Sequence, residues 1–310
     1  GFEADFDPEA LEAMFDFAED MHKDATAKGE AFEAATIFAD AGKLEALEVM
    51  YEFAEDVGRD AGEGFEANFD PEALETIFDF AEDMHKDAVA AGGTFEASTA
   101  FDASKLEAIE AVYEFAEDLS LEGGDTFEAD FDPEALEALY LFADDQVKAG
   151  KAGGDAFDPE ALEAVFHIAD DAVGEAGFDP NVGFDLKAFD AVYDYADAEA
   201  DKAGFNGDTG FDKHALEALY EFADQAVDEA GYDPNVGFDA NAFDALYDMV
   251  DVQANQDGFD PNAGFDVRAL DAIFDMADSQ ADGKVFDPNA MLGMYEMIDA
   301  KADSDTISVA

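Results

Sequence analysis

Apolar side chains recur along this chain at the spacing of one face of an α-helix. Within residues 186–200, Phe189, Val192, Tyr193 and Ala196 fall at i, i+3, i+4 and i+7. Residues at these spacings share one side of a helix, and the acidic residues between them occupy the other side. The sequence therefore predicts an amphipathic helix here, and the same pattern returns from one end of the chain to the other.

The helical pattern belongs to a repeated unit that opens with a phenylalanine. The leading residues are Phe2, Phe32, Phe65, Phe95, Phe127, Phe157, Phe184, Phe211, Phe238, Phe265 and Phe286. Their spacings alternate between 30 and 32 or 33 residues up to Phe157, are then 27 residues, and end at 21. Internal repeats of this length indicate stacked structural units. We therefore expect about eleven similar helices, one in each unit.

Aspartate and proline mark where the predicted helices begin. In several units proline follows an aspartate, as at Pro8, Pro71, Pro133 and Pro159. An Asp side chain accepts hydrogen bonds from the first backbone N–H groups of a helix, and proline fits the first turn because its missing N–H would have no partner there. Glycines such as Gly150 are expected just past the helix ends.

A single amphipathic helix of about four turns cannot bury its apolar face alone, so the units must stack on one another. We predict an all-α fold in which about eleven one-helix repeats form an elongated solenoid or helical-repeat rod. By repeat length the chain divides into residues 1–156, with units one to five, and residues 157–300, with units six to eleven. Residues 301–310 form a tail that breaks the repeat. Linkers of about ten residues leave parallel and antiparallel stacking open.

The charge of the chain restricts its partners. Its 310 residues include 14 Lys and Arg against 81 Asp and Glu, so the formal net charge is −67. A polyanion of this density is repelled by nucleic-acid phosphates and by anionic lipid surfaces. We expect neither nucleic-acid binding nor membrane insertion, since no apolar run approaches the roughly 20 residues of a membrane span. A cationic partner, such as a basic protein, is compatible with this charge.

The composition nevertheless predicts a folded protein. Apolar residues make up 49% of the chain, and 31 phenylalanines supply ample surface to bury, so disorder is not expected despite the charge. Like charges at i, i+3 and i+4 on the outer helix faces cost roughly 0.2–0.5 kcal/mol per pair, and salt screens them. We therefore expect the fold to depend on high salt or on divalent cations.

The excess of acidic residues over lysine resembles the composition of proteins from extreme halophiles. A marine protein secreted into millimolar calcium would have a similar composition, and a start at Gly1 is expected of a processed or exported product. We expect an extracellular protein, or one on a cell or virion surface, while the cytoplasm of a halophile fits the composition as well.

The chain has no cysteine, which excludes disulfides and thiol chemistry.

Four linkers of the second half share a pattern of oxygen-bearing side chains. Asp or Asn stands at positions one and three, Asp at seven and an acid at twelve of each linker. The residues are Asp179, Asn181, Asp185 and Asp190; Asn206, Asp208, Asp212 and Glu217; Asp233, Asn235, Asp239 and Asp244; and Asp260, Asn262, Asp266 and Asp271. Calcium takes six to eight oxygen ligands, and this loop leading into a helix resembles an EF-hand calcium loop. The resemblance implies structural Ca²⁺ that neutralises and stiffens the linkers.

The linker pattern also has a second interpretation. Glycine stands at position five instead of six, so position five offers no side-chain ligand. Asp-Pro-Asn-x-Gly is a good turn sequence, the Asp at seven is a helix cap, and the acid at twelve belongs to a solvated helix face. The sequence leaves both interpretations open.

No residue pattern indicates catalysis. His22 and His85 occupy the same place in two repeats, and neither His167 nor His214 has the spacing of a zinc pair or of a nucleophile with its base. Acidic pairs occur in every unit, so none stands out as a general acid and base. We expect no enzymatic activity.

These patterns favour a structural function. The first unit is as apolar as the internal ones, whereas repeat arrays normally end in polar caps. A second copy could cover this open face, and such contacts assemble end to end into filaments, coats or scaffolds. We predict a non-enzymatic structural repeat protein stabilised by salt or divalent cations. Two alternatives are a calcium-binding repeat module that uses the linkers and an acidic adaptor for a basic protein.

Overall fold

The computed structural model describes residues 8–28, 41–61, 69–95, 97, 103–123, 131–150, 157–174, 184–200, 202, 211–227, 232, 237–256, 259, 265–279 and 286–307. These residues form eleven α-helices and no β-strand, and each helix falls within one predicted unit. The predicted all-α repeat fold is therefore confirmed. None of the helices in the described ranges is both long and apolar enough to span a membrane.

The chain divides into two compact units, Gly1–Pro159 and Glu160–Ala310. Unit 1 contains α1 (Pro8–Lys28), α3 (Ala41–Ala61), α4 (Pro71–Ala90), α6 (Ala103–Gly123) and α7 (Pro133–Ala149). α8 (Pro159–Gly174) begins at the last residue of unit 1 and continues in unit 2. The other helices of unit 2 are α9 (Leu186–Ala200), α10 (Lys213–Val227), α11 (Ala240–Ala254), α12 (Val267–Asp278) and α13 (Pro288–Ile307). α13 thus continues into the segment that the sequence analysis assigned to a tail.

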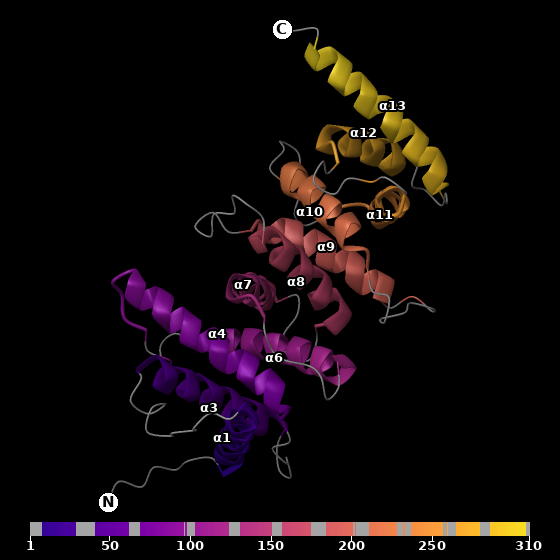
Figure 1. The fold of residues 1–310 in the computed structure, drawn as a ribbon. Coiled ribbons are helices and arrows are strands. Elements are labelled where there is room, and N and C mark those ends of the chain that lie inside the picture. The colour runs from indigo at the N-terminus through magenta and orange to yellow at the C-terminus, as the bar shows by residue number, and fades with distance from the viewer. Residues whose placement is uncertain are drawn as a thin grey trace, which may run out of the picture. The chain divides into compact units, whose positions relative to one another are not determined.

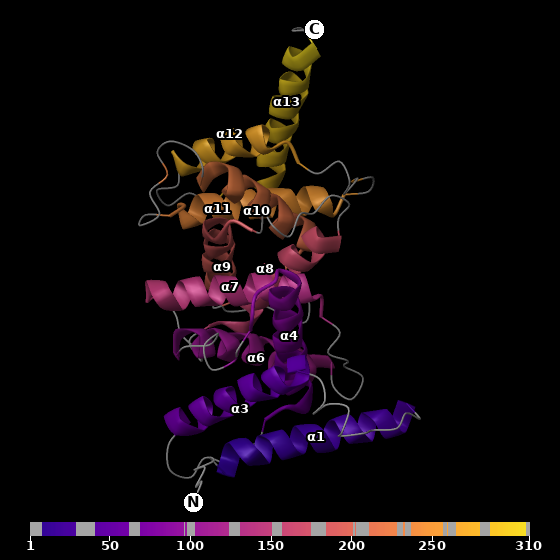
Figure 2. The same ribbon diagram turned by 90° about the vertical axis from the view of Figure 1, so that its left-hand side faces the viewer.

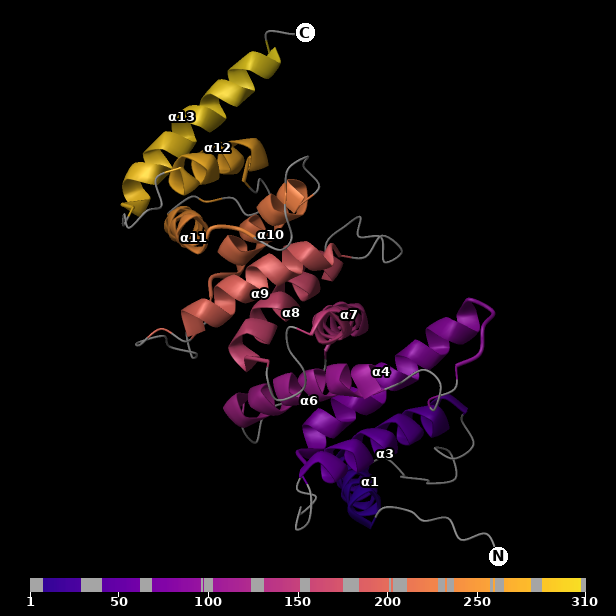
Figure 3. The same ribbon diagram turned by 180° about the vertical axis from the view of Figure 1, so that it is seen from behind.

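Consecutive helices pack on one another within each unit. From α1 to α7 in unit 1, and from α9 to α13 in unit 2, each helix contacts the next one and the next but one. The axes of neighbouring helices cross. α1 is seen almost end-on in Figure 1 and across the view in Figure 2, whereas α3 runs across the view in Figure 1. Figure 3 shows the same succession in unit 2, from α9 through α10 to α11.

The helices begin and end with the residues that the sequence indicates. Asp239 has an extended backbone, and its Oδ1 accepts hydrogen bonds of 3.0 Å from the N–H groups of both Asn241 and Ala242. Proline opens α1, α4, α7 and α8. Gly150 adopts the left-handed conformation (φ 69) just past α7, which glycine does without steric cost.

The core is made of alanine and large apolar side chains. Alanines such as Ala73 and Ala81 are fully buried and let neighbouring helices approach closely. The largest fully buried side chains include Phe17, Phe53, Phe80, Phe115, Phe142, Phe189 and Phe222. Burying apolar surface contributes about 25 cal/mol per Å², whereas the ion pairs here involve exposed lysine and arginine side chains and contribute little. Apolar packing between repeats therefore holds the fold together.

Candidate functional site

Half of the predicted calcium ligands lie outside the described residues. They are Asp179, Asn181, Asn206, Asp208, Asp233, Asn235, Asp260 and Asn262, which occupy positions one and three of the four linkers.

The other eight predicted ligands are described, and four of them cap helices. Asp185, Asp212, Asp239 and Asp266 directly precede α9, α10, α11 and α12, and each accepts a hydrogen bond from a backbone N–H in the first turn. The acids at position twelve, Asp190, Glu217, Asp244 and Asp271, lie on those helices. Within the described part of the chain, no group of three or more His, Asp or Glu side chains could hold a metal ion. Calcium binding by the linkers stays a prediction.

Three histidines contact residues near them in the chain. His167 Nε2 lies 3.1 Å from Glu163 Oε1, and this hydrogen bond raises the pKa of His167. His214 Nδ1 lies 3.6 Å from a carboxylate oxygen of Glu217 on the same helix. The ring of His85 packs edge-on against another ring, with centroids 6.0 Å apart. The contacts of His167 and His214 lie within one helix, whereas the ring beside His85 is that of Phe95, which leads the next unit.

Every helix carries two large side chains two residues apart, and we name their places from α4. Position A is that of Phe78, and position B is that of Phe80. Position A is occupied by Phe15, Tyr51, Phe78, Tyr113, Tyr140, Phe166, Tyr193, Tyr220, Tyr247, Phe274 and Tyr295. Position B is occupied by Phe17, Phe53, Phe80, Phe115, Phe142, Ile168, Tyr195, Phe222, Met249, Met276 and Met297.

Position B of one helix contacts position A of the helix two further on. The ring centroids lie 5.4 Å apart for Phe17 and Phe78, 5.2 Å for Phe53 and Tyr113, 5.2 Å for Phe80 and Tyr140, 5.1 Å for Tyr195 and Tyr247, and 4.9 Å for Phe222 and Phe274. Aromatic pairs at such distances contribute about 0.5–1.5 kcal/mol beyond their buried area. One recurring contact therefore ties α1 to α4, α3 to α6 and α4 to α7 in unit 1, and α9 to α11 and α10 to α12 in unit 2.

This recurring contact is incomplete at the first and last described helices. Phe15, at position A of α1, is 67% exposed, whereas Phe78 at the same position of α4 is 3% exposed. Met297, at position B of α13, is also 67% exposed, whereas Met249 in α11 is fully buried. Leu11, one turn before Phe15, is exposed as well. The first helix thus exposes a position A side chain, and the last helix exposes a position B side chain.

A second recurring contact joins a helix start to the following helix. The backbone N–H of the capping aspartate donates a hydrogen bond to a tyrosine hydroxyl at position A. The pairs are Asp70 and Tyr113 at 2.7 Å, Asp185 and Tyr220 at 3.1 Å, Asp212 and Tyr247 at 2.9 Å, and Asp266 and Tyr295 at 2.8 Å. Burial raises the pKa of Tyr295 to about 12, so its hydroxyl is neutral at pH 7. The tyrosines therefore partner N–H groups that lie just before each helix.

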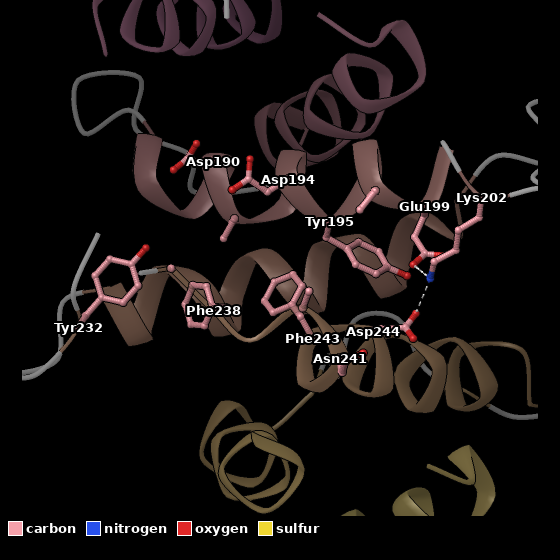
Figure 4. A pocket seen from close by; sticks show the side chains of 14 residues that line it. Asp190, Asp194, Tyr195, Glu199, Lys202, Tyr232, Phe238, Asn241, Phe243 and Asp244 are labelled. Atoms are coloured by element: carbon pink, nitrogen blue, oxygen red, sulfur yellow. Dashed lines mark hydrogen bonds and ion pairs between the residues drawn. The ribbon is translucent and has the colours of Figure 1, made fainter. Parts of the chain in front are cut away.

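Unit 2 contains a cavity of about 280 Å³ between α9 and the residues at the start of α11 (Figure 4). The side chains that Figure 4 labels around it are Asp190, Asp194, Tyr195, Glu199, Lys202, Tyr232, Phe238, Asn241, Phe243 and Asp244. The rings of Tyr232, Phe238 and Phe243 follow one another, with successive centroids 5.4 Å and 5.3 Å apart. They give the cavity an apolar wall.

The rim of this cavity is acidic. Lys202 is its single basic residue, and the Lys202 ammonium contacts Glu199 and lies 3.4 Å from Asp244 Oδ1, as the dashed lines in Figure 4 show. Burial raises the pKa of the Glu199 carboxyl. Asp190 and Asp194 add two further carboxylates, so the lining carries more negative than positive charge.

No protein-family model, curated protein sequence or solved structure matches this chain. Its repeats provide an internal standard, because a residue that serves packing between repeats is expected to recur in each unit.

Neither the cavity nor the pairing of position B with position A could be predicted from the sequence. Spacing along one helix does not reveal which neighbour covers its face, so the pairing needs the fold. One signal for the cavity was present. Tyr195 is the one tyrosine at position B, where the other units carry Phe, Met or Ile.

Proposed function

We propose that this protein is a non-enzymatic structural repeat protein whose helix array continues from the last helix of one copy to the first helix of the next. The observation that carries the proposal is the exposure of Phe15 at position A of α1 and of Met297 at position B of α13, because side chains at these positions are buried against other helices inside the chain. Inside the chain, the side chains at these positions are stabilised by burial. The exposed ones at the two ends are stabilised in the same way when a second copy covers them.

The internal contact also sets the register of the proposed assembly. When α1 of a second copy follows α13, position B of α12 meets Phe15, and position B of α13 meets position A of α3. The new pairs are Met276 with Phe15 and Met297 with Tyr51. A methionine sulfur against an aromatic ring contributes about 0.3–1.5 kcal/mol. The two surfaces differ, so the contact propagates into a filament unless its rotation closes a ring.

The strength of this association depends on the salt concentration. Each copy carries a net charge of −67, and unscreened copies repel one another. The screening length falls from about 8 Å near 0.15 M salt to about 3 Å at 1 M. The apolar contact is short-ranged and gains from this screening, so association strengthens as salt concentration rises.

Sedimentation velocity in 1 M NaCl, over a range of protein concentrations, tests the proposal. Phe15→Asp places a charge in the proposed contact. Leu121→Asp is the matched control, because Leu121 is 72% exposed but belongs to α6, which is neither of the two end helices. We expect the wild type and Leu121→Asp to form concentration-dependent oligomers and Phe15→Asp to stay monomeric. A monomeric wild type, or equal assembly of both variants, would overturn the proposal.

A further inference from the structure

We infer that the cavity between α9 and α11 binds a small organic amine, with its ammonium group at Tyr195 and the acidic rim and its apolar body against the aromatic wall. This inference is independent of end-to-end assembly, because no residue that lines the cavity belongs to α1, α12 or α13.

Tyr195 is the first observation that supports a ligand. Its side chain is 8% exposed, and its hydroxyl makes no hydrogen bond with the described part of the chain. The hydroxyl is aimed along the cavity toward Glu199 and Lys202 in Figure 4. The hydroxyl oxygen is not sealed off from solvent, so a ligand that enters the cavity can reach it. Phenylalanine fills the same position in six other helices, so packing alone gives no reason for the hydroxyl.

The wall of the cavity supports an apolar ligand body. The ring of Tyr195 lies 5.7 Å from that of Phe243, which stands 5.3 Å from Phe238. Ring faces attract both apolar groups and cations. Ligand cavities usually span about 300–1,000 Å³, so a volume of about 280 Å³ fits a ligand at the small end, such as a single ring with a short side chain.

The rim determines the charge of the ligand. Four of the residues that line the cavity carry carboxylates, and the one ammonium group, that of Lys202, is already paired with Glu199 and Asp244. An anionic ligand would be repelled here, whereas a cation gains from this field. The Tyr195 hydroxyl oxygen can accept a hydrogen bond from an ammonium N–H. The aromatic wall favours an organic cation, and the described residues offer no group of carboxylates that could hold a metal ion.

The test is a ¹⁹F NMR titration of the full chain in 0.5 M NaCl, which suppresses unspecific attraction of cations to the polyanion. The probe is 4-fluorophenethylamine, and 2-(4-fluorophenyl)ethanol and 4-fluorophenylacetate are its neutral and anionic analogues. We expect saturable binding of one amine per chain, at least tenfold weaker binding of the alcohol, and no binding of the acid. Equal affinity for the amine and the alcohol, or no saturation with the amine, would overturn the inference.

Tyr195→Phe is the decisive variant. It restores the residue that other helices carry at position B, so the variant is expected to fold. Loss of one hydrogen bond should weaken amine binding about fivefold. Tyr295→Phe is the matched control, because it removes a tyrosine hydroxyl from unit 2 outside the cavity and should leave the affinity unchanged. Unchanged affinity of Tyr195→Phe, or equal weakening by both variants, would contradict the proposed site.

Discussion

At the scale of single residues, a tyrosine hydroxyl completes the start of a neighbouring helix. The hydroxyl of Tyr247 accepts a hydrogen bond from the N–H of Asp212, the residue whose carboxylate caps α10. An N–H at this point lies outside the helical ladder and needs a partner of another kind. In α12 the same position holds Phe274, which has no hydroxyl to offer to Asp239. The chain therefore contains helix starts with the tyrosine hydrogen bond and one helix start where phenylalanine replaces the tyrosine.

We expect Tyr247→Phe to lower the free energy of unfolding by about 1 kcal/mol, because the N–H of Asp212 loses its hydrogen-bond partner. Phe274→Tyr adds a hydroxyl at the equivalent place and should not lower stability. Urea denaturation followed by circular dichroism in 1 M NaCl measures both changes. If Tyr247→Phe proves as stable as the wild type, the hydroxyl contributes nothing to the helix start.

The sequence predicts the caps but not the tyrosine that joins them. A cap involves residues two or three apart, and the Asp-Pro pairs at Pro71 and Pro133 indicate it directly. The hydrogen bond from Asp212 to Tyr247 spans 35 residues, and its formation depends on how two helices pack. The residue pattern within one unit carries no information on how two helices pack.

At the scale of helices, one side chain can connect three elements. The ring of Phe222 in α10 lies 4.9 Å from Phe274 in α12 and 6.2 Å from Phe243 in α11. It is 1% exposed, so its burial contributes to both helix contacts at once. The stability of these repeats therefore resides in the interfaces between helices.

Phe222→Ala should lower the free energy of unfolding by about 3–5 kcal/mol, because it removes a buried ring and leaves a cavity among three helices. The control is Leu141→Ala on α7, where the side chain is 44% exposed. This surface change is expected to alter stability by less than about 0.5 kcal/mol. Thermal unfolding followed by circular dichroism compares the two, and similar losses for both would contradict this account of the core.

Helix positions could be predicted from the sequence because every unit carries its own start signal and apolar face. Which face meets which neighbour could not be predicted. The contact between position B and position A skips one helix, as in Phe53 and Tyr113. For the same reason the cavity beside Tyr195 was not foreseen, since α9 and α11 are separated in the sequence by all of α10.

At the scale of the whole molecule, folding brings acidic groups into surroundings that disfavour their charge. Burial, together with neighbouring carboxylates, raises the pKa of Glu117, Glu137 and Asp248. A carboxyl group with a raised pKa binds its proton more tightly in the folded state than in the unfolded state. Its contribution to stability is therefore present at low pH and is lost as the pH rises through the folded pKa.

We accordingly expect the melting temperature at low salt to rise when the pH is lowered from 7 to 5. The hydrogen bond that raises the pKa of His167 acts in the same direction. Circular dichroism melts at several pH values measure the trend, and 1 M NaCl should reduce it because salt screens the repulsion between carboxylates. A melting temperature that falls over this interval would show that the acidic surface does not destabilise the fold.

The most direct test of end-to-end assembly mixes two variants that block opposite ends. Phe15→Asp leaves the α13 end intact, and Met297→Asp leaves the α1 end intact. Sedimentation velocity in 1 M NaCl should find each variant monomeric on its own, whereas the equimolar mixture should contain a complex of two chains and nothing larger. Assembly of either variant alone, or a mixture that stays monomeric while the wild type assembles, would contradict the account.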